Sequence, residues 1–235
     1  MMRCARCGRE AAESDKFCAE CGMFLRDAWV NQRMLSPLLA ESEGRHQEAR
    51  RELERLVEMQ PQVGLAWHCL GTMHMHQGTL NRAIECYRKA VELAPRFLLC
   101  WYDLGVAYYH RGNMPASIAA YRRCLEIDPH YNAAHYRLGV ALFHAGDLDR
   151  ARSHFEECSA LTPEYLRARY HVGLIHQRKG DLEAAEREFR AYAAEALGEA
   201  SSLYHLSEIR GARGDAKGAA QLLEQARAAG RTVSA

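Results

Sequence analysis

Apolar and small residues recur along the chain with a period of 34 residues. The clearest unit carries Trp67, Leu70, Gly71, Gly78, Ala83, Tyr87, Ala90 and Pro95. Adding 34 to each number gives Trp101, Leu104, Gly105, Gly112, Ser117, Tyr121, Cys124 and Pro129. The pattern continues in weaker form to Ala226 and backwards to Gly44. It predicts six units in phase, at 30–63, 64–97, 98–131, 132–165, 166–199 and 200–233.

Each unit predicts two helices joined by a tight turn. Its fourth, seventh, eighth and eleventh positions share one helical face, and the small eighth residue lets a neighbouring helix approach closely. Asp147 and Asp181 are expected to cap the second helix of their units. Stacked pairs would share a continuous core. The first helix should end at Gly78, Gly112, Gly146, Gly180 and Gly214, and the second before Pro95, Pro129 and Pro163.

This Trp–Leu–Gly–Tyr–Ala–Pro pattern resembles the tetratricopeptide repeat (TPR), most closely in units 64–97 and 98–131. The first unit departs from it with Ser36 and Pro37, and the sixth with Ser207 and no proline near its end. The resemblance implies an all-α fold, a right-handed superhelical solenoid of about six TPR units over residues 28–235. It also implies a concave groove lined by the first helices.

Five positions of each first helix point away from the predicted core, and in the central units they form an aromatic and apolar stripe edged by histidines and one arginine. If the tyrosines pack on neighbouring helices, the row belongs to the core. If they do not, it is a groove for an apolar or aromatic segment of a partner protein, or for a second copy of the chain. The predicted groove residues are His68, Met75, His76, Tyr102, Tyr109, His110, Tyr136, Phe143, His144, Tyr170, Arg178 and Tyr204.

Some members of the family hold a C-terminal carboxylate of a chaperone with a clamp of Lys, Asn and Arg. The matching positions here are aromatic or apolar, so we do not expect this chain to bind that partner. An acidic group of a ligand would instead contact Arg178 and protonated histidines. The exposed row His76, His110 and His144 lacks a compact metal-ligand set. His74 and His176 occupy the buried tyrosine position of the family and are interpreted as core residues. Cys124 and Cys158 are interpreted as small core residues.

Two copies of Cys-x2-Cys-Gly lie ten residues apart near the start of the chain, with thiols at Cys4, Cys7, Cys18 and Cys21. Two such turns supply four soft ligands for a tetrahedral Zn²⁺, with iron or a redox dithiol as alternatives. Residues 1–27 resemble the short zinc-ribbon modules of bacterial proteins. Four thiolates leave no open position, so the zinc is expected to be structural, and the metal would supply the folding energy of so short a segment.

Lys and Arg total 31 and Asp and Glu total 30, so the formal net charge is +1. Such a balance carries no signature for nucleic acid or anionic membranes. No apolar run approaches the length of a membrane span, and a cytoplasmic protein is expected. No phosphate loop or nucleophile elbow occurs, so no enzyme is expected. The leading hypothesis is a protein-binding scaffold with the zinc module as a second contact. The alternative is a nucleic-acid-associated adaptor whose zinc ribbon touches RNA or DNA.

Overall fold

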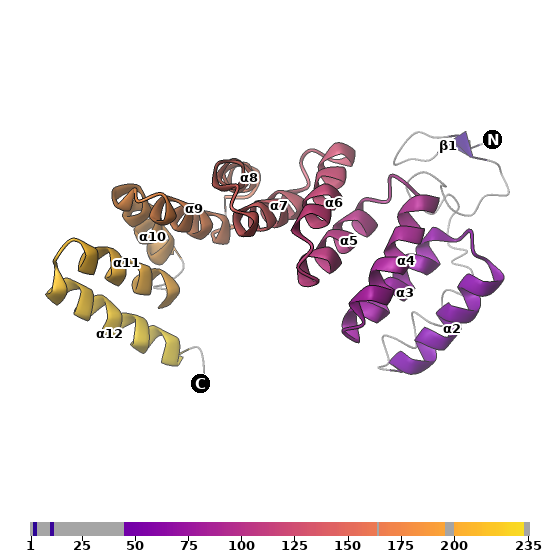
Figure 1. Cartoon of the computed structure of the whole chain (residues 1–235), viewed down its shortest axis with the longest axis horizontal. Coiled ribbons are helices and arrows are strands. Elements are labelled where there is room, and N and C mark those ends of the chain that lie inside the picture. The colour runs from indigo at the N-terminus through magenta and orange to yellow at the C-terminus, as the bar shows by residue number, and fades with distance from the viewer. Residues whose placement is uncertain (1, 4–9, 12–44, 164, 196–199, 233–235) are drawn as a thin grey trace. The chain divides into compact units, whose positions relative to one another are not determined.

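The computed structural model describes residues 2–3, 10–11, 45–163, 165–195 and 200–232. Almost all of them are helical, as Figure 1 shows. The helices are α2 (His46–Met59), α3 (Gly64–His76), α4 (Leu80–Leu93), α5 (Leu98–His110), α6 (Met114–Ile127), α7 (Asn132–Ala145), α8 (Leu148–Leu161), α9 (Arg167–Arg178), α10 (Leu182–Glu195), α11 (Ala200–Ala212) and α12 (Ala216–Thr232). Two short strands, β1 (Met2–Arg3) and β2 (Glu10–Ala11), pair antiparallel, with Arg3 opposite Glu10.

The helices form two compact units, residues 1–129 and 130–235. In the first unit α3 packs on α4 and α5 on α6; in the second α7 packs on α8, α9 on α10 and α11 on α12. Each pair also contacts the next pair of its unit through α4 and α5, through α8 and α9, or through α10 and α11. These pairs are the predicted repeats from 64 onward, and α2 is the second helix of the first repeat. The remainder of that repeat, with Ser36 and Pro37, lies outside the described residues.

Glycine and proline set the ends of the helices as the sequence predicts. The five glycines that follow the first helices all have positive φ, between 72° and 85°, where a side chain would be strained. The second helices α4, α6 and α8 end at Leu93, Ile127 and Leu161, each two residues before a proline. Proline disfavours helical geometry in the preceding residue, so the chain leaves the helix there.

Polar caps begin the second helices. The carboxylates of Asp147 and Asp181 accept hydrogen bonds from the backbone N–H of Arg150 and Ala184, as predicted. Asn113 and Asp215 also cap α6 and α12, which the sequence interpretation missed although both follow a turn glycine in the same way.

At the centre of the core, the four repeats from 64 to 199 each place one aromatic ring against a glycine of the partner helix. Tyr87, Tyr121, Phe155 and Phe189 are at most 1% exposed. A Cβ added at Gly105 would lie 2.6 Å from Cε1 of Tyr121, and Gly71, Gly139 and Gly173 face their rings in the same way. The small eighth residue therefore admits a ring of the second helix. Cys124 and Cys158 are fully buried, which confirms their interpretation as small core residues.

Candidate functional site

The predicted groove residues lie on the first helices of the repeats, and the face that they form is called here the first-helix face. In the first unit it carries His68, Met75 and His76 on α3, and Tyr102, Tyr109 and His110 on α5. His76 and His110 are exposed, whereas Met75, Tyr102 and Tyr109 are half-buried. The structure thus places these residues on neighbouring helices with part of each side chain accessible.

His68 is mostly buried and has partners within the protein, unlike an open groove residue. Only 14% of its side chain is exposed, and its Nε2 lies 2.7 Å from Oδ2 of Asp103 on α5. Its ring also packs against Phe97, with 4.8 Å between the ring centroids. His68 therefore joins the first helices of two consecutive repeats. Asp103, one residue after Tyr102, was not among the predicted site residues.

The two tyrosines of α5 combine packing with accessibility. The ring of Tyr102 lies 5.9 Å from that of Tyr121, in the core of its own repeat. Tyr109 meets the exposed His110 edge to face at 5.8 Å. Each ring thus rests on the repeat along one side and keeps another side accessible. Half-buried rings of this kind can contact a partner at little entropic cost because they are already ordered.

In the second unit the first-helix face is built around an aromatic cluster. Tyr136 packs against Tyr165 at 4.9 Å, His171 at 5.4 Å and Phe155 at 5.7 Å. Burial, and to a lesser extent Tyr165, raises the pKa of the Tyr136 phenol to about 12. The hydroxyl therefore remains protonated near neutral pH and is available as a hydrogen-bond donor.

Two histidines that the sequence interpretation did not select stack on the core rings of the preceding repeat. His171 lies on Phe155 at 4.8 Å and His205 on Phe189 at 5.0 Å, with interplanar angles of 28° and 14°. Burial lowers the pKa of His171, and its hydrogen bond to the backbone carbonyl of Arg167 opposes this shift only in part. The sequence pattern could have indicated both histidines, because the pair Phe155 and His171 recurs 34 residues later as Phe189 and His205.

Phe143 is only 5% exposed, although the helical pattern places it on the first-helix face. The guanidinium of Arg178 lies over its ring, 4.0 Å from the centroid. Arg178 itself is exposed, as is the adjacent His144. The accessible chemistry at this point is therefore cationic, with an aromatic ring beneath it.

Tyr170 and Tyr204 complete the predicted row in different environments. The Tyr170 hydroxyl lies 3.1 Å from Nε2 of His205, and its ring packs against Tyr192 and Phe189. Tyr204 is 48% exposed. Of the twelve predicted groove residues, Tyr204, Arg178 and the three histidines His76, His110 and His144 are the exposed ones.

The histidines predicted for the core are half-buried and lie close to polar side chains of their own repeats. Nδ1 of His74 lies 2.9 Å from the Thr79 hydroxyl, and Nδ1 of His176 lies 3.6 Å from Oδ2 of Asp181. Burial lowers the pKa of His74, with the nearby Arg50 acting in the same direction. Both histidines therefore stabilise the turn between the two helices of a repeat.

The predicted zinc ligands Cys4, Cys7, Cys18 and Cys21 lie outside the described residues. Within the described ranges no group of three metal-binding side chains is close enough to hold an ion. The buried cysteines of the repeats are unsuited to the task, because burial raises the pKa of Cys86 to about 11 and that of Cys124 to about 12. Protonated, buried thiols do not compete for metal.

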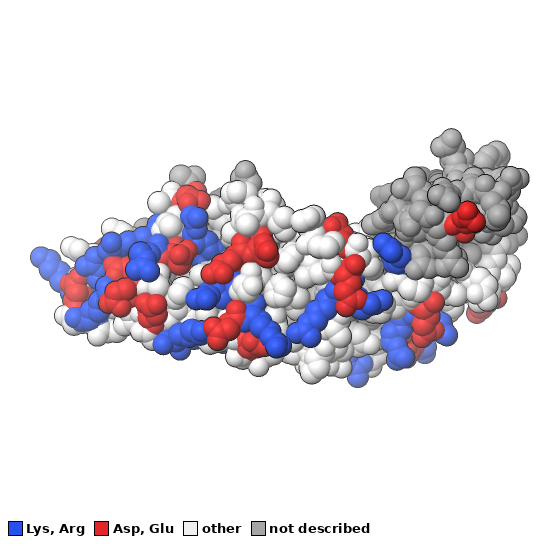
Figure 2. Space-filling view, turned by 90° about the horizontal axis from the view of Figure 1, so that it is seen from above, with Lys and Arg blue, Asp and Glu red and all other residues white. Residues whose placement is uncertain are grey.

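No helix among the described residues is long and apolar enough to cross a lipid bilayer. Figure 2 shows Lys and Arg interleaved with Asp and Glu along the described helices on the face it views. That face carries no stripe of a single charge sign, of the kind that nucleic-acid-binding proteins present.

Comparison with family models identifies repeats in the centre of the chain. Models of the tetratricopeptide repeat match residues 99–131 and 133–165, and a TPR repeat model matches residues 71–112. A comparison with curated proteins found no match.

Solved structures resemble the chain over most of its length. The crystal structure of MamA is 26% identical with a TM-score of 0.66, covering 68% of this chain and 94% of MamA. YrrB, described as a TPR protein with an unusual peptide-binding site, is 19% identical with a TM-score of 0.63, over 74% of this chain and 90% of YrrB. A tetratricopeptide repeat protein from Parabacteroides merdae is 17% identical with a TM-score of 0.73, over 83% of this chain and 77% of its own. The helix pairs, their capping residues and these matches together show that the chain contains tetratricopeptide repeats.

Proposed function

We propose that the chain is a non-catalytic scaffold that binds segments of other proteins on the first-helix faces of its two units. The observation that carries the proposal is the pairing of ordered, half-accessible aromatic rings with exposed histidines on these faces. Tyr102, Tyr109 and His110 provide it in the first unit. Interaction sites are enriched in such tyrosines, because a pre-ordered ring offers a large contact area at low entropic cost.

The second unit adds a preference for acidic ligands. Arg178 is exposed and has no ion pair with any described residue, while its guanidinium is held over Phe143. A carboxylate placed there could accept two hydrogen bonds from the planar guanidinium. The proposed ligand of this face is a segment with apolar or aromatic side chains and at least one Asp or Glu.

Affinity purification from native cells, read by mass spectrometry, tests the proposal. The wild-type chain is compared with a first-unit variant, Tyr109→Ala with His110→Ala, and a second-unit variant, Arg178→Ala with Tyr204→Ala. These positions are exposed or half-buried, so the folds should survive, which circular dichroism checks. A matched control is Arg122→Glu, at an exposed position of the second helix α6.

We expect at least one protein to be recovered with the wild type and the control and lost with one of the face variants. A purified partner should then bind at least tenfold more weakly to that variant. Recovery of the same partners with all four proteins would contradict the proposal and direct attention to the N-terminal segment and the second helices.

We further propose that residues 1–27 bind one structural zinc ion through Cys4, Cys7, Cys18 and Cys21. Two copies of Cys-x2-Cys-Gly are the support for this, together with the antiparallel pairing of β1 and β2 on either side of the first cysteine pair. Four thiolates match the preferred ligands and coordination number of zinc. Bound metal would hold the segment together and allow it to act as a second contact for a partner.

Elemental analysis of protein purified without added metal tests the zinc site. One zinc per chain is expected, and Cys4→Ser with Cys21→Ser should abolish it while leaving the helical signal of the repeats unchanged. The control Cys69→Ser, at a half-buried thiol of α3, should retain the metal. Iron in place of zinc, or four freely titrating thiols and no metal, would contradict the assignment.

A further inference from the structure

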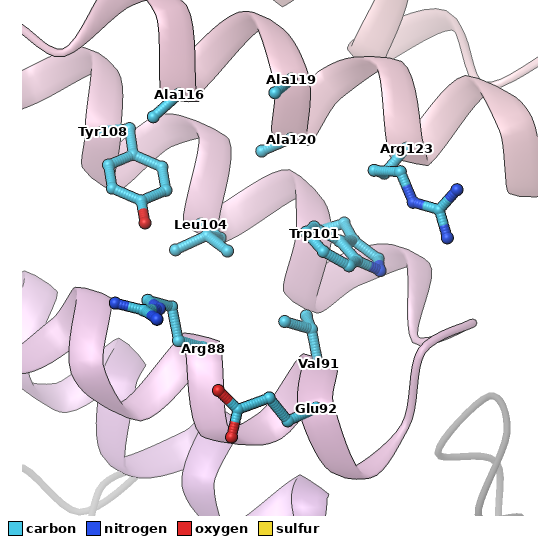
Figure 3. A pocket seen from close by; sticks show the side chains of 10 residues that line it. All are labelled: Arg88, Val91, Glu92, Trp101, Leu104, Tyr108, Ala116, Ala119, Ala120 and Arg123. Carbon is cyan, nitrogen blue, oxygen red and sulfur yellow. The ribbon is translucent and has the colours of Figure 1, made fainter.

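A second candidate binding site lies on a different face of the first unit. Helices α4, α5 and α6 enclose an open cavity of about 400 Å³, shown in Figure 3 and called here the Trp101 cavity. Its α5 residues Trp101, Leu104 and Tyr108 follow the 3–4 spacing of one helical face, which is distinct from the face of Tyr102 and Tyr109. A ligand in this cavity would therefore not occupy the first-helix face.

The cavity exists because α6 presents small side chains where it could have presented large ones. Ala116, Ala119 and Ala120 line one wall, and Val91 of α4 lies across from them. Apart from Arg88, Glu92 and Arg123, the lining residues are apolar or aromatic. Preformed apolar hollows of this size commonly hold ligands.

The Trp101 side chain, at one end of the cavity, is held in place by contacts within the protein. The indole Nε1 of Trp101 donates a hydrogen bond to the carbonyl oxygen of Pro95 at 2.8 Å. The Arg123 guanidinium covers the same ring at 5.7 Å and forms an ion pair with Glu126. Because these groups are already satisfied, a ligand would not have to break existing bonds to enter.

At one end of the cavity lie two hydrogen-bond donors that have no acceptor among the described residues. Among the described residues, neither the guanidinium of Arg88 nor the hydroxyl of Tyr108 has a hydrogen-bond or ion-pair partner. The carboxylates within one turn of Arg88 are engaged elsewhere, Glu85 with Arg82 and Glu92 with Lys89. Figure 3 shows Arg88 and Tyr108 at the same end, with the Glu92 carboxylate nearer to Arg88 than to Trp101. Because Glu92 is already paired with Lys89, Arg88 and Tyr108 remain the groups at this end that can bind an anion.

We propose that the Trp101 cavity binds an acidic amphipathic segment of a partner protein. One apolar side chain of the segment fills the space between Leu104 and Ala119. A neighbouring Asp or Glu accepts hydrogen bonds from Arg88 and from the Tyr108 hydroxyl. The apolar contact supplies burial, and the charge-assisted bonds fix the direction of the segment. This site is independent of the first-helix face and could be occupied together with it.

Selection from a random twelve-residue peptide library tests the proposal. Peptides are selected on the whole wild-type protein and counter-selected on Ala119→Phe, in which a ring is added at an exposed position and fills the cavity. Enriched peptides should carry Phe, Leu or Ile within two residues of Asp or Glu. Their affinity, measured by calorimetry, should fall about tenfold or more in Ala119→Phe and in Arg88→Glu.

A matched control is Ser153→Phe, an exposed residue at the corresponding position of α8, which should bind the peptides as the wild type does. Arg88 is exposed as well, so Arg88→Glu provides a test even if Ala119→Phe does not fold. The proposal is overturned if no peptide is enriched over the counter-selection, or if enriched peptides lack an acidic residue or bind Arg88→Glu unchanged. It is also overturned if Tyr109→Ala removes binding while Ala119→Phe preserves it.

Discussion

The imidazole of His171 lies flat on the ring of Phe155, with 4.8 Å between the ring centroids and 28° between their planes. The stack joins α9 to the core ring of the preceding repeat. Because burial lowers the pKa of His171 in the folded protein, the unfolded chain binds the proton more readily. Folding stability should therefore fall as the pH drops below about 6.5 towards the folded pKa.

Replacing His171 by Phe should reduce this pH dependence, since the stack is kept and the titrating group is removed. Urea denaturation of the wild type and the variant from pH 7.5 to 5 measures the difference. His74, whose pKa is also lowered by burial, contributes equally to both proteins and cancels. His76→Phe, at an exposed position, should retain the wild-type slope. Parallel curves for wild type and His171→Phe would refute the prediction.

Alanine at Gly105 and at Gly211 should have opposite effects on stability. The new methyl group at Gly105 would lie 2.6 Å from Cε1 of the buried Tyr121, so overpacking of roughly 1–3 kcal/mol should outweigh the gain in helix propensity. At Gly211 the nearest atom, Cβ of Ala219, is 3.9 Å away, and propensity alone should stabilise by roughly 0.5–1 kcal/mol. Chemical denaturation measures the free energy of unfolding of both variants. Equal changes in the two would show that the Tyr121 ring does not restrict the residue at position 105.

Removing the carboxylate of Glu186 should destabilise the second unit. Only 12% of its side chain is exposed, and it pairs with Arg213, with Arg190 at 2.5 Å and with Arg210 at 3.8 Å. Glu186→Ala would remove the carboxylate that the three arginines share, although Arg210 keeps Asp215 and Arg213 keeps Glu183, and should cost about 1–3 kcal/mol. The exposed pair Arg82–Glu85 offers the control, because Glu85→Ala should cost less than about 1 kcal/mol. Thermal unfolding of the two variants compares them, and equal midpoints would contradict the assignment.

Cys69 should be the first thiol of the repeats to react with an alkylating reagent. It is half-buried, whereas Cys86, Cys100, Cys124 and Cys158 are buried, and burial raises the pKa of each of these four thiols. The reactive thiolate is therefore scarce at the four buried positions. Peptide mapping after brief alkylation of the native protein should find the label at Cys69, and the other four should react only on unfolding. Early label at Cys100 would show that this core opens readily.

The ends of the helices could be predicted because they depend on backbone rules that act within a few residues. Positive φ at Gly146 and the restriction that Pro95 places on Ala94 operate in any surroundings. The buried stripe Ala83, Tyr87 and Ala90 followed from helical periodicity alone. The caps at Asn113 and Asp215 were open to the same reasoning, since each follows a turn glycine as Asp147 does.

The sequence by itself determined the repeat, its helix pairs and the positions of the small and aromatic core residues, because each rests on spacing within 34 residues. Only the tertiary structure decided which side chains of the first-helix face stay accessible. Phe143 is buried with Arg178 of the next first helix over its ring, His68 is bonded to Asp103, and His171 is stacked on Phe155. Helical periodicity assigns a residue to a face, but the contacts between repeats decide whether that face meets solvent, a ring or a charge.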